Sequence, residues 1–394
     1  MKKQTQAIHL EYERRDAYDS LSVPVYNTLA YEFDNAAVMA EAFTDKIKAP
    51  DYSRVENPTV TNLERRVAAL TDAAHATAFN SGMAAISNTL MALAAQGKNI
   101  VTSKHLFGNT YALLVATLRR FGVKVRLRDL TNIEAVREAI DDDTCCVFLE
   151  ILTNPQLEVA DLKAISEVAH EKNVPLVVDS TVIPFTQFSA KSLGVDIEVV
   201  SSSKYVSGGA TSLGGLVIDY GTPYNGDFAK RLYGEMLFNF GAYMTPQVAY
   251  MQTIGLETLD ARYRVQSGNA LELAKKLRTL PQIQYVNYVG LEDNPYHELA
   301  QRQFGKTAGA MICIDLESKE ACFSFLNNLK LIHRATNLFD NRSLAIHPAS
   351  TIFGAFSESM RKSMDVKDTT IRLSVGLEDV DDLFEDIKQA VNSL

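Results

Sequence analysis

Short apolar runs rich in Val and Ile alternate with helix-length segments between about residues 74 and 220. The runs cover residues 76–79, 100–102, 123–127, 145–150, 175–179, 197–200 and 216–218. Strands that are buried on both faces have such uninterrupted apolar sequences. Seven of them with helices between them predict a mostly parallel α/β sheet, in which ligands bind beyond the carboxyl ends of the strands.

The segment before this region shows little regular periodicity. Residues 1–56 are therefore predicted to form an N-terminal arm that packs on another surface. A helix is predicted to begin at Thr61, because Thr61 and Glu64 have capping-box spacing and apolar residues follow at helical intervals.

The segment after the sheet region predicts a second, smaller domain. Residues 219–247 contain Gly, Pro and many aromatic residues, which indicates a connecting segment with a long loop. A helix of apolar periodicity from Leu259 to Leu277 is expected to stop before Pro281. Strands at 310–315 and 370–375 and helices at 320–329 and 383–391 complete an α+β unit. The predicted limits are 1–56 for the arm, 57–250 for the first domain and 251–394 for the second.

Composition and charge argue against several classes of protein. The chain has 394 residues, 46% of them hydrophobic, which is ordinary globular usage. Its net charge of −9 argues against nucleic acid as a main partner. No apolar run approaches the ~18 residues of a membrane helix, and the N-terminus lacks a signal-peptide core. The four cysteines form no CxxC pair, so a reducing cytoplasm is the expected location.

Several common catalytic motifs are missing. The sequence contains no GxSxG, no GxxxxGK and no GxGxxG. His297-Glu298 is followed by Gln301, where a zinc-binding HExxH motif requires a second histidine. A metal site is therefore not expected, and a nicotinamide-dependent oxidoreductase is disfavoured.

Two polar residues follow buried strands. Asp179 comes directly after an apolar run, where it is either a turn residue or a carboxylate directed at a cationic ligand atom. Lys204 follows Ser201-Ser202-Ser203 and precedes Gly208-Gly209. It is either a solvated surface lysine or a desolvated amine beside a phosphate site.

Two further features indicate anion binding. Ser81-Gly82-Met83 follows a strand and opens a helix, so it is either a plain tight turn or a phosphate cradle at a helix N-terminus. Arg372 points away from the apolar face of strand 370–375. It is either a solvent-facing arginine on a half-exposed strand or a bidentate clamp on a carboxylate. A lysine, an aspartate, a phosphate cradle and an arginine together match the needs of pyridoxal 5'-phosphate (PLP) chemistry.

The chain from about Val23 onwards resembles the PLP-dependent transsulfuration enzymes of Cys/Met metabolism. The family includes cystathionine γ-synthase, methionine γ-lyase and O-acetylhomoserine sulfhydrylase. The matching stretches are Tyr52-Ser53-Arg54 with Asn57-Pro58-Thr59, Ser81-Gly82-Met83, Val178–Thr181, Ser201–Tyr205, Gly255–Leu259, Ser343–Ser350 and Arg372–Gly376. The resemblance implies the PLP-dependent transferase fold type I, with a mostly parallel seven-stranded sheet and a smaller C-terminal α+β domain.

The resemblance also implies residue roles. Lys204 would be the Schiff-base lysine and Asp179 the partner of the pyridine nitrogen. Ser81, Gly82, Met83, Ser201 and Ser203 would surround the phosphate, Phe107 would stack on the ring and Asn154 would contact the ring hydroxyl. Asn337 and Arg372 would bind the substrate carboxylate. Tyr52 and Arg54 would reach the phosphate of a neighbouring subunit, so the site would need at least a dimer. The expected assembly is a homotetramer built as a dimer of dimers.

Details within the family favour the sulfhydrylase. Residues 211–215 and 345–351 resemble its corresponding segments, and Asn109 stands where γ-lyases often carry a cysteine. The expected reaction is γ-replacement on O-acetylhomoserine by sulfide or a small thiol. Cystathionine γ-synthase, a methionine or cystathionine γ-lyase and a non-catalytic scaffold of the same fold remain alternatives, and the acyl group and nucleophile stay open.

Four positions depart from the family pattern. Phe107 replaces the usual stacking tyrosine, and Leu152 stands where proline is common. Gly209-Ala210 replaces a histidine-containing step, and Phe339 replaces a glycine near the substrate pocket.

Overall fold

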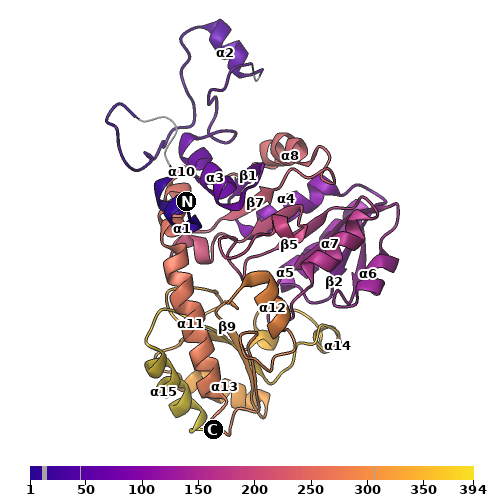
Figure 1. Ribbon diagram of the computed structural model, residues 1–394, viewed down its shortest axis with the longest axis vertical. Coiled ribbons are helices and arrows are strands. Elements are labelled where there is room, and N and C mark those ends of the chain that lie inside the picture. The colour runs from indigo at the N-terminus through magenta and orange to yellow at the C-terminus, as the bar shows by residue number, and fades with distance from the viewer. Residues whose placement is uncertain (11–15, 45, 307) are drawn as a thin grey trace.

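The computed structural model describes residues 1–394 except 11–15, 45 and 307. A seven-stranded sheet lies above a five-stranded sheet in the view of Figure 1. The order of the larger sheet is β1-β7-β6-β5-β4-β2-β3, and only β7 runs antiparallel to its neighbours. Its strands are β1 (His75–Phe79), β2 (Asn99–Ser103), β3 (Lys124–Arg128), β4 (Thr144–Glu150), β5 (Leu176–Asp179), β6 (Ile197–Val200) and β7 (Gly215–Asp219). The predicted seven-stranded, mostly parallel α/β sheet is confirmed.

The larger sheet is buried on both faces, because alternate residues of each strand enter two different cores. Val147 and Leu149 of β4 join one core, whereas Cys146 and Phe148 join the other. Helices α3 (Pro58–Thr71), α6 (Ile133–Ala139) and α7 (Leu162–His170) contribute to the first core. Helix α4 (Gly82–Leu93) and the helical stretches 108–121 and 228–240 contribute to the second. These stretches contain α5 (Gly108–Ala112), α8 (Phe228–Arg231) and α9 (Phe238–Phe240).

Two expectations about helices are wrong in detail. Helix α3 begins at Pro58 rather than Thr61, because the Asn57 side chain accepts a hydrogen bond from the Thr59 N–H at 3.0 Å and Pro58 takes the first helical position. The expected loop within 219–247 is helical over 228–240. Phe228, Leu232 and Leu237 of that stretch are buried in the second core, so tertiary packing stabilises the helix there.

The smaller sheet has the order β10-β11-β12-β9-β8. Its strands are β8 (Tyr285–Asn287), β9 (Met311–Asp315), β10 (His333–Arg334), β11 (Leu344–Ile346) and β12 (Thr370–Ser374). Its helices are α11 (Leu259–Leu277), α12 (His297–Phe304), α13 (Lys319–Asn328), α14 (Glu358–Ser363) and α15 (Val380–Val391). The predicted α+β character is confirmed. The predicted limit at residue 250 falls within α10 (Pro246–Glu257), and the domain limits stay predictions.

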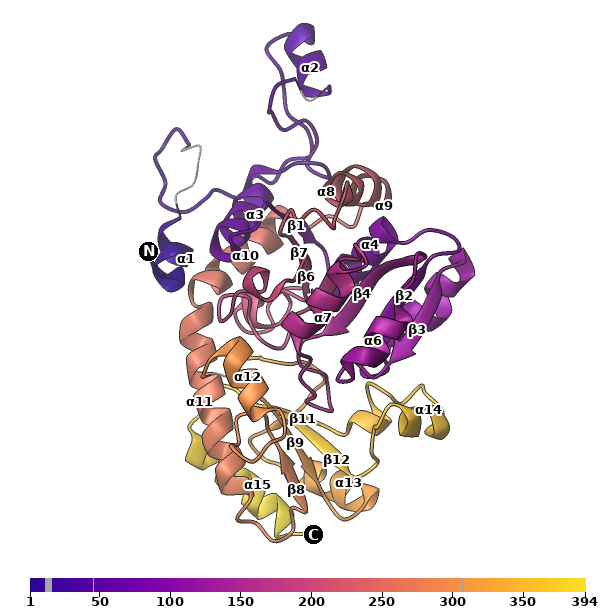
Figure 2. The same ribbon diagram turned by 45° about the vertical axis from the view of Figure 1, so that its right-hand side comes forward.

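The N-terminal segment lies partly on the body and partly away from it. Helix α1 (Lys3–His9) contacts α3 and α10. Helix α2 (Ala36–Ala42) stands apart on a long excursion of the chain, as Figures 1 and 2 both show. Leu29 and Phe43 on this excursion are about 60% exposed, so the arm presents apolar side chains that its own chain does not cover.

A histidine connects the two halves of the molecule. The His105 side chain follows β2, and its Nδ1 lies 3.0 Å from a Glu158 carboxylate oxygen. Its Nε2 lies 2.7 Å from Asp365, just beyond α14. Lys104 adds a salt bridge to the same Asp365 oxygen at 2.7 Å. The loop after β2 is thereby fastened to the segment around α14.

No helix within the described parts of the chain is long and apolar enough to cross a membrane.

Candidate active site

A cavity of about 370 Å³ lies at the carboxyl ends of β4, β5 and β6. This is the edge of the sheet at which the strand pattern places a ligand. Ten of the residues predicted to bind the cofactor or substrate line it: Ser81, Gly82, Met83, Phe107, Asn154, Asp179, Ser201, Ser203, Lys204 and Arg372. The fold therefore brings together side chains that are up to 291 positions apart in the sequence, from Ser81 to Arg372.

Lys204 extends into this cavity from the turn that follows β6. Its Nζ donates a hydrogen bond to Asn337 Oδ1 at 2.7 Å, which places the predicted Asn337 beside the amine. Burial, and then the positive charge of Arg372, lower the pKa of Lys204 to about 8. An amine with this pKa has a substantial neutral fraction near neutral pH and can act as a base or nucleophile.

Asp179 ends β5 and directs its carboxylate into the same cavity. The carboxylate accepts a hydrogen bond from the Thr181 N–H at 2.9 Å. Burial raises the pKa of Asp179 above its usual range. A buried carboxylate of this kind is stabilised by a positively charged partner, such as a protonated ring nitrogen.

The N-terminus of α4 approaches the turn after β6 very closely. Ser81 caps the helix, because its Oγ accepts a hydrogen bond from the Ala84 N–H at 3.1 Å. A Cβ atom at Gly82 would lie 2.6 Å from Ser201 Cβ and 2.9 Å from Ser201 Cα. Only glycine permits this approach, which brings the helix N–H groups next to the Ser201 and Ser203 segment. The result is a concave, positively polarised surface suited to a phosphate.

Arg372 is buried, which excludes the alternative of a solvent-facing arginine on a half-exposed strand. All five residues of β12 are buried, and Arg372 is 2% exposed. Its Nη1 donates to Asn154 Oδ1 at 3.1 Å and its Nη2 to the Asn337 carbonyl at 3.3 Å. Burial lowers the pKa of Arg372 to about 10. Its Nε has no hydrogen-bond partner among the described residues, so the guanidinium retains capacity for an anionic ligand.

Tyr52 and Arg54 do not reach the cavity of their own chain. Arg54 Nη1 donates to the Phe238 carbonyl at 2.6 Å, and its guanidinium lies 5.4 Å from the centre of the Tyr52 ring. Neither residue lines the Lys204 cavity.

Glu150 lines the cavity but was not singled out in the sequence. It ends β4 as Asp179 ends β5, so an acidic residue directly after an apolar run was the available signal. Burial, and then the negative charge of Asp179, raise the pKa of Glu150 to about 8.

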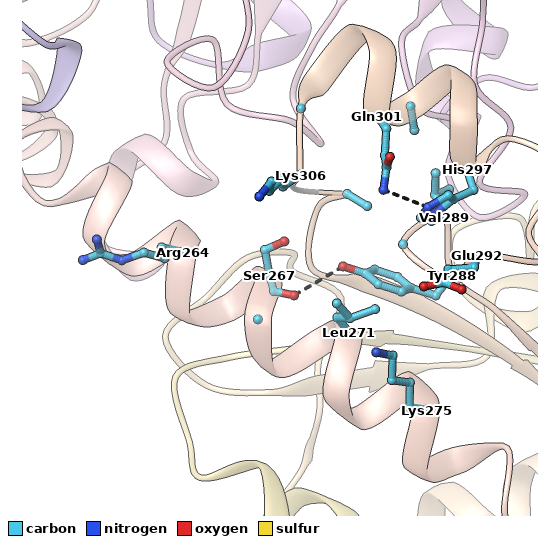
Figure 3. Close-up of a pocket in the computed structure, with 15 residues that line it drawn as sticks. Arg264, Ser267, Leu271, Lys275, Tyr288, Val289, Glu292, His297, Gln301 and Lys306 are labelled. Atoms are coloured by element: carbon cyan, nitrogen blue, oxygen red, sulfur yellow. Dashed lines mark hydrogen bonds between the residues drawn. The ribbon is translucent and has the colours of Figure 1, made fainter.

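A second cavity of about 270 Å³ lies between α11, α12 and the loop after β8 (Figure 3). It contains none of the residues predicted to bind a cofactor or substrate. The Gln301 amide hydrogen-bonds His297 Nε2 at 2.8 Å, and the Tyr288 hydroxyl donates to the Ser267 carbonyl at 3.3 Å. Because it holds none of the predicted cofactor or substrate residues, this cavity is not the candidate active site. The described residues also contain no cluster of His, Cys, Asp or Glu placed to hold a metal ion.

Known proteins share this sequence and fold along nearly the whole chain. The sequence profile of the family "Cys/Met metabolism PLP-dependent enzyme" matches residues 4–392. The L-methionine gamma-lyase of Fusobacterium nucleatum subsp. polymorphum is 37% identical, with 99% of this chain and 98% of the lyase covered. The O-acetyl-L-homoserine sulfhydrylase of Corynebacterium glutamicum is 32% identical, with 98% and 95% covered.

The chain belongs to the PLP-dependent Cys/Met metabolism family. A solved structure of a putative O-acetylhomoserine (thiol)-lyase from Campylobacter jejuni superimposes with a TM-score of 0.95, at 34% identity and with both chains fully covered. That structure contains N'-pyridoxyl-lysine-5'-monophosphate. The predicted fold type I, the enzymatic nature of the chain and PLP as its cofactor are therefore confirmed.

The residues of this family member fit PLP. A single cavity holds an amine of lowered pKa at Lys204, a carboxylate at Asp179 and a glycine cradle at Gly82 that a Cβ would fill. These are the three group types that the aldehyde, the ring nitrogen and the phosphate of PLP require.

Proposed function

We propose that this family member catalyses γ-replacement on an activated homoserine. The substrate would be O-acetylhomoserine, and sulfide or a small thiol would replace acetate to give homocysteine or methionine. The family and the cofactor support PLP-dependent chemistry on a sulfur-metabolism amino acid. The choice within the class rests on the residues that surround Lys204.

PLP, when bound, supplies an electron sink that makes the hydrogen on the α-carbon of the substrate acidic. In this proposal Asp179 would pair with the ring nitrogen, and the Gly82 turn with Ser201 and Ser203 would hold the phosphate. Asn154 would contact the ring hydroxyl. Lys204 Nζ, with its pKa of about 8, would take a proton from the substrate carbon and later return it.

Arg372 would bind the substrate carboxylate. Its guanidinium is already fixed by Asn154 and by the Asn337 carbonyl, and the Nε is unpaired among the described residues. Asn337 holds the Lys204 amine at 2.7 Å. The carboxylate site and the proton-transfer group are therefore linked through one residue, which orients the substrate carbon toward Lys204.

The observation that carries the choice of substrate is the lining of the cavity. Among the described residues, that lining contains no tyrosine, histidine or cysteine, and Phe107 occupies the position of the usual tyrosine. An acetate leaving group needs little protonation as it departs, whereas a thiolate needs an acid nearby. Phe107, which lacks a hydroxyl that could protonate a departing thiolate, thus favours an acyl ester over methionine or cystathionine.

A γ-lyase activity is the second candidate. The methionine gamma-lyase of Fusobacterium nucleatum is 37% identical, compared with 32% for the sulfhydrylase of Corynebacterium glutamicum. Overall similarity therefore does not favour the sulfhydrylase, and cystathionine γ-synthase shares the same first steps.

The test is an assay of the purified protein with O-acetylhomoserine and sulfide, with O-acetylhomoserine and cysteine, with O-acetylhomoserine alone, and with methionine alone. We expect homocysteine and acetate in equal amounts from the first mixture at the highest rate. Faster release of methanethiol and 2-oxobutanoate from methionine would refute the proposal. Lys204→Ala is the inactive control, and borohydride should fix the cofactor to wild-type protein but not to this variant.

We also propose that the active unit is a homotetramer built as a dimer of dimers. The support is the excursion around α2, whose apolar residues are exposed, and the absence of Tyr52 and Arg54 from the cavity of their own chain. The cytoplasmic location stays a prediction.

A further inference from the structure

Glu150 is a buried carboxyl group at the active site for which the proposed reaction has no task. It is 6% exposed and lines the cavity with Asp179 and Lys204. Glu150 and Asp179 are paired in register on the adjacent parallel strands β4 and β5, so both side chains lie on the same face of the sheet. Two carboxylates placed side by side in a buried site do not both ionise at neutral pH.

The Glu150 carboxyl group is fixed by backbone donors. Its Oε1 accepts a hydrogen bond from the Phe107 N–H at 2.5 Å, and the Asn154 N–H also contacts the carboxyl group. Phe107 precedes α5, and a Cβ at the next residue, Gly108, would lie 2.7 Å from the Ile352 carbonyl. The Phe107 backbone is thus hydrogen-bonded to Glu150, and the residue after it packs closely against the Ile352 carbonyl.

We propose that Glu150 is a positioning residue, which sets the Phe107 ring against the cofactor plane and stays uncharged so that Asp179 is the one anionic carboxylate at the ring. The proposal rests on the roles proposed above for Asp179 and Phe107. It assigns two tasks to one side chain. The acceptor oxygen holds Phe107, and the retained proton keeps a second negative charge away from Asp179.

The surroundings of Glu150 determine which carboxyl group retains the proton. Asp179 faces it from β5, Lys204 lies across the cavity after β6, and Arg372 lies on β12. The segment that carries Phe107 adds only uncharged groups to the cavity lining, Phe107 and Asn109. Burial and then Asp179 raise the pKa of Glu150 to about 8. Protonated PLP would favour the charged form of Asp179, so the proton would remain on Glu150.

Two substitutions separate the tasks. Glu150→Gln keeps an acceptor oxygen for the Phe107 N–H and mimics the uncharged carboxyl group. Glu150→Ala removes the acceptor and leaves a buried N–H without a partner. The matched control is Glu198→Gln, which changes an equally buried glutamate on β6 that binds Ser180 and Tyr220 and does not line the cavity.

The measurements need no substrate, so they are independent of which γ-carbon reaction the enzyme catalyses. Each variant is stripped of PLP and titrated with it, and the visible circular dichroism of the bound cofactor is recorded from pH 6 to 9.5. We expect Glu150→Gln and Glu198→Gln to bind PLP within about threefold of wild type at pH 7, with wild-type dichroism. Glu150→Ala should bind about ten- to hundredfold more weakly, with reduced dichroism.

The pH series tests whether Glu150 carries a proton at neutral pH. The pH dependence of the dichroism should differ between wild type and Glu150→Gln and be the same in wild type and Glu198→Gln. The proposal is overturned if Glu150→Ala binds PLP with unchanged affinity and dichroism, or if Glu150→Gln is as impaired as Glu150→Ala. If Glu150→Ala does not fold, as judged by far-ultraviolet dichroism, the pH series on Glu150→Gln decides. A pH series of that variant that coincides with the wild-type series overturns the proposal.

Discussion

The contact between Gly82 and Ser201 yields a sharp prediction about cofactor binding. Gly82→Ala adds one methyl group at the first residue of α4. That carbon would lie 2.6 Å from Ser201 Cβ, 2.7 Å from Ser201 Oγ and 2.9 Å from Ser201 Cα. A serine side chain can rotate away from a contact, but Cα belongs to the backbone. The start of α4 and the turn after β6 must therefore separate by several tenths of an ångström.

The energetic consequences have two parts. Forcing an extra methyl group into a close-packed site costs about 1–3 kcal/mol of folding stability. Separation of the helix N-terminus from Ser201 also weakens the hydrogen bonds to the phosphate, and losing one bond to a charged group costs about 1.5–3 kcal/mol. At about 1.4 kcal/mol per tenfold change, PLP should bind roughly 10- to 150-fold more weakly.

The assay is a titration of the stripped protein with PLP, followed by visible absorbance, together with a urea unfolding curve. Gly268→Ala is the matched control, because Gly268 lies inside α11 and nothing approaches its Cβ position within 4 Å. The control should bind PLP normally and gain up to about 1 kcal/mol of stability. If Gly82→Ala binds PLP within twofold of wild type and unfolds at the same urea concentration, the close approach has no role in binding.

Three further predictions follow from other parts of the molecule. Phe107→Tyr should raise the rate of methionine cleavage relative to O-acetylhomoserine turnover, because it restores a hydroxyl near the leaving group; an unchanged ratio of the two rates contradicts this explanation. Arg54→Ala and Lys204→Ala chains should each be inactive and regain partial activity when reassembled together, and no recovery in verified mixed oligomers argues against a shared site. Burial lowers the pKa of His105, but its two neighbouring carboxylates more than offset this and leave the pKa above 6.5. The resulting stability should therefore be present below pH 6.5 and lost as the pH rises through the folded-state value; urea unfolding of wild type and His105→Gln at pH 6 and 9 should show a larger loss in wild type, and equal losses contradict this role of His105.

The sequence predicted the larger sheet well because burial on both faces leaves an unambiguous apolar run. Even the antiparallel β7 was found as a strand, although its direction cannot be read from such a run. Strands of two or three residues, such as β10 (His333–Arg334), contain too few positions for any period to show. The helical stretch 228–240 was missed because its Gly and Pro neighbours indicated a loop, while its stability comes from contacts with α4.

The sequence predicts site residues one at a time, from their position directly after an apolar run, and it contains no information on which of them contact each other. Asp179 and Lys204 were found because each follows an apolar run. Glu150 satisfies the same criterion, but its significance depends on its pairing with Asp179, which only the sheet order reveals. The burial of Arg372 likewise depends on packing between the two sheets, which the alternation of residues along one strand does not encode.

Two hydrogen bonds of the candidate site join parts of the chain that are synthesised at different times. One connects Lys204 to Asn337, and the other connects Arg372 to Asn154. Asn154 and Lys204 are synthesised well before their partners, and Arg372 lies on β12, the last strand in chain order. Folding of the N-terminal part during synthesis can shape the cradle at Gly82 and the Asp179 carboxylate, but the guanidinium arrives only when the chain is nearly complete. A chain that stops before β12 would therefore carry the Gly82 turn and the Asp179 carboxylate but lack the guanidinium that we propose binds the substrate carboxylate. The carboxylate site is the last part of the pocket that synthesis completes.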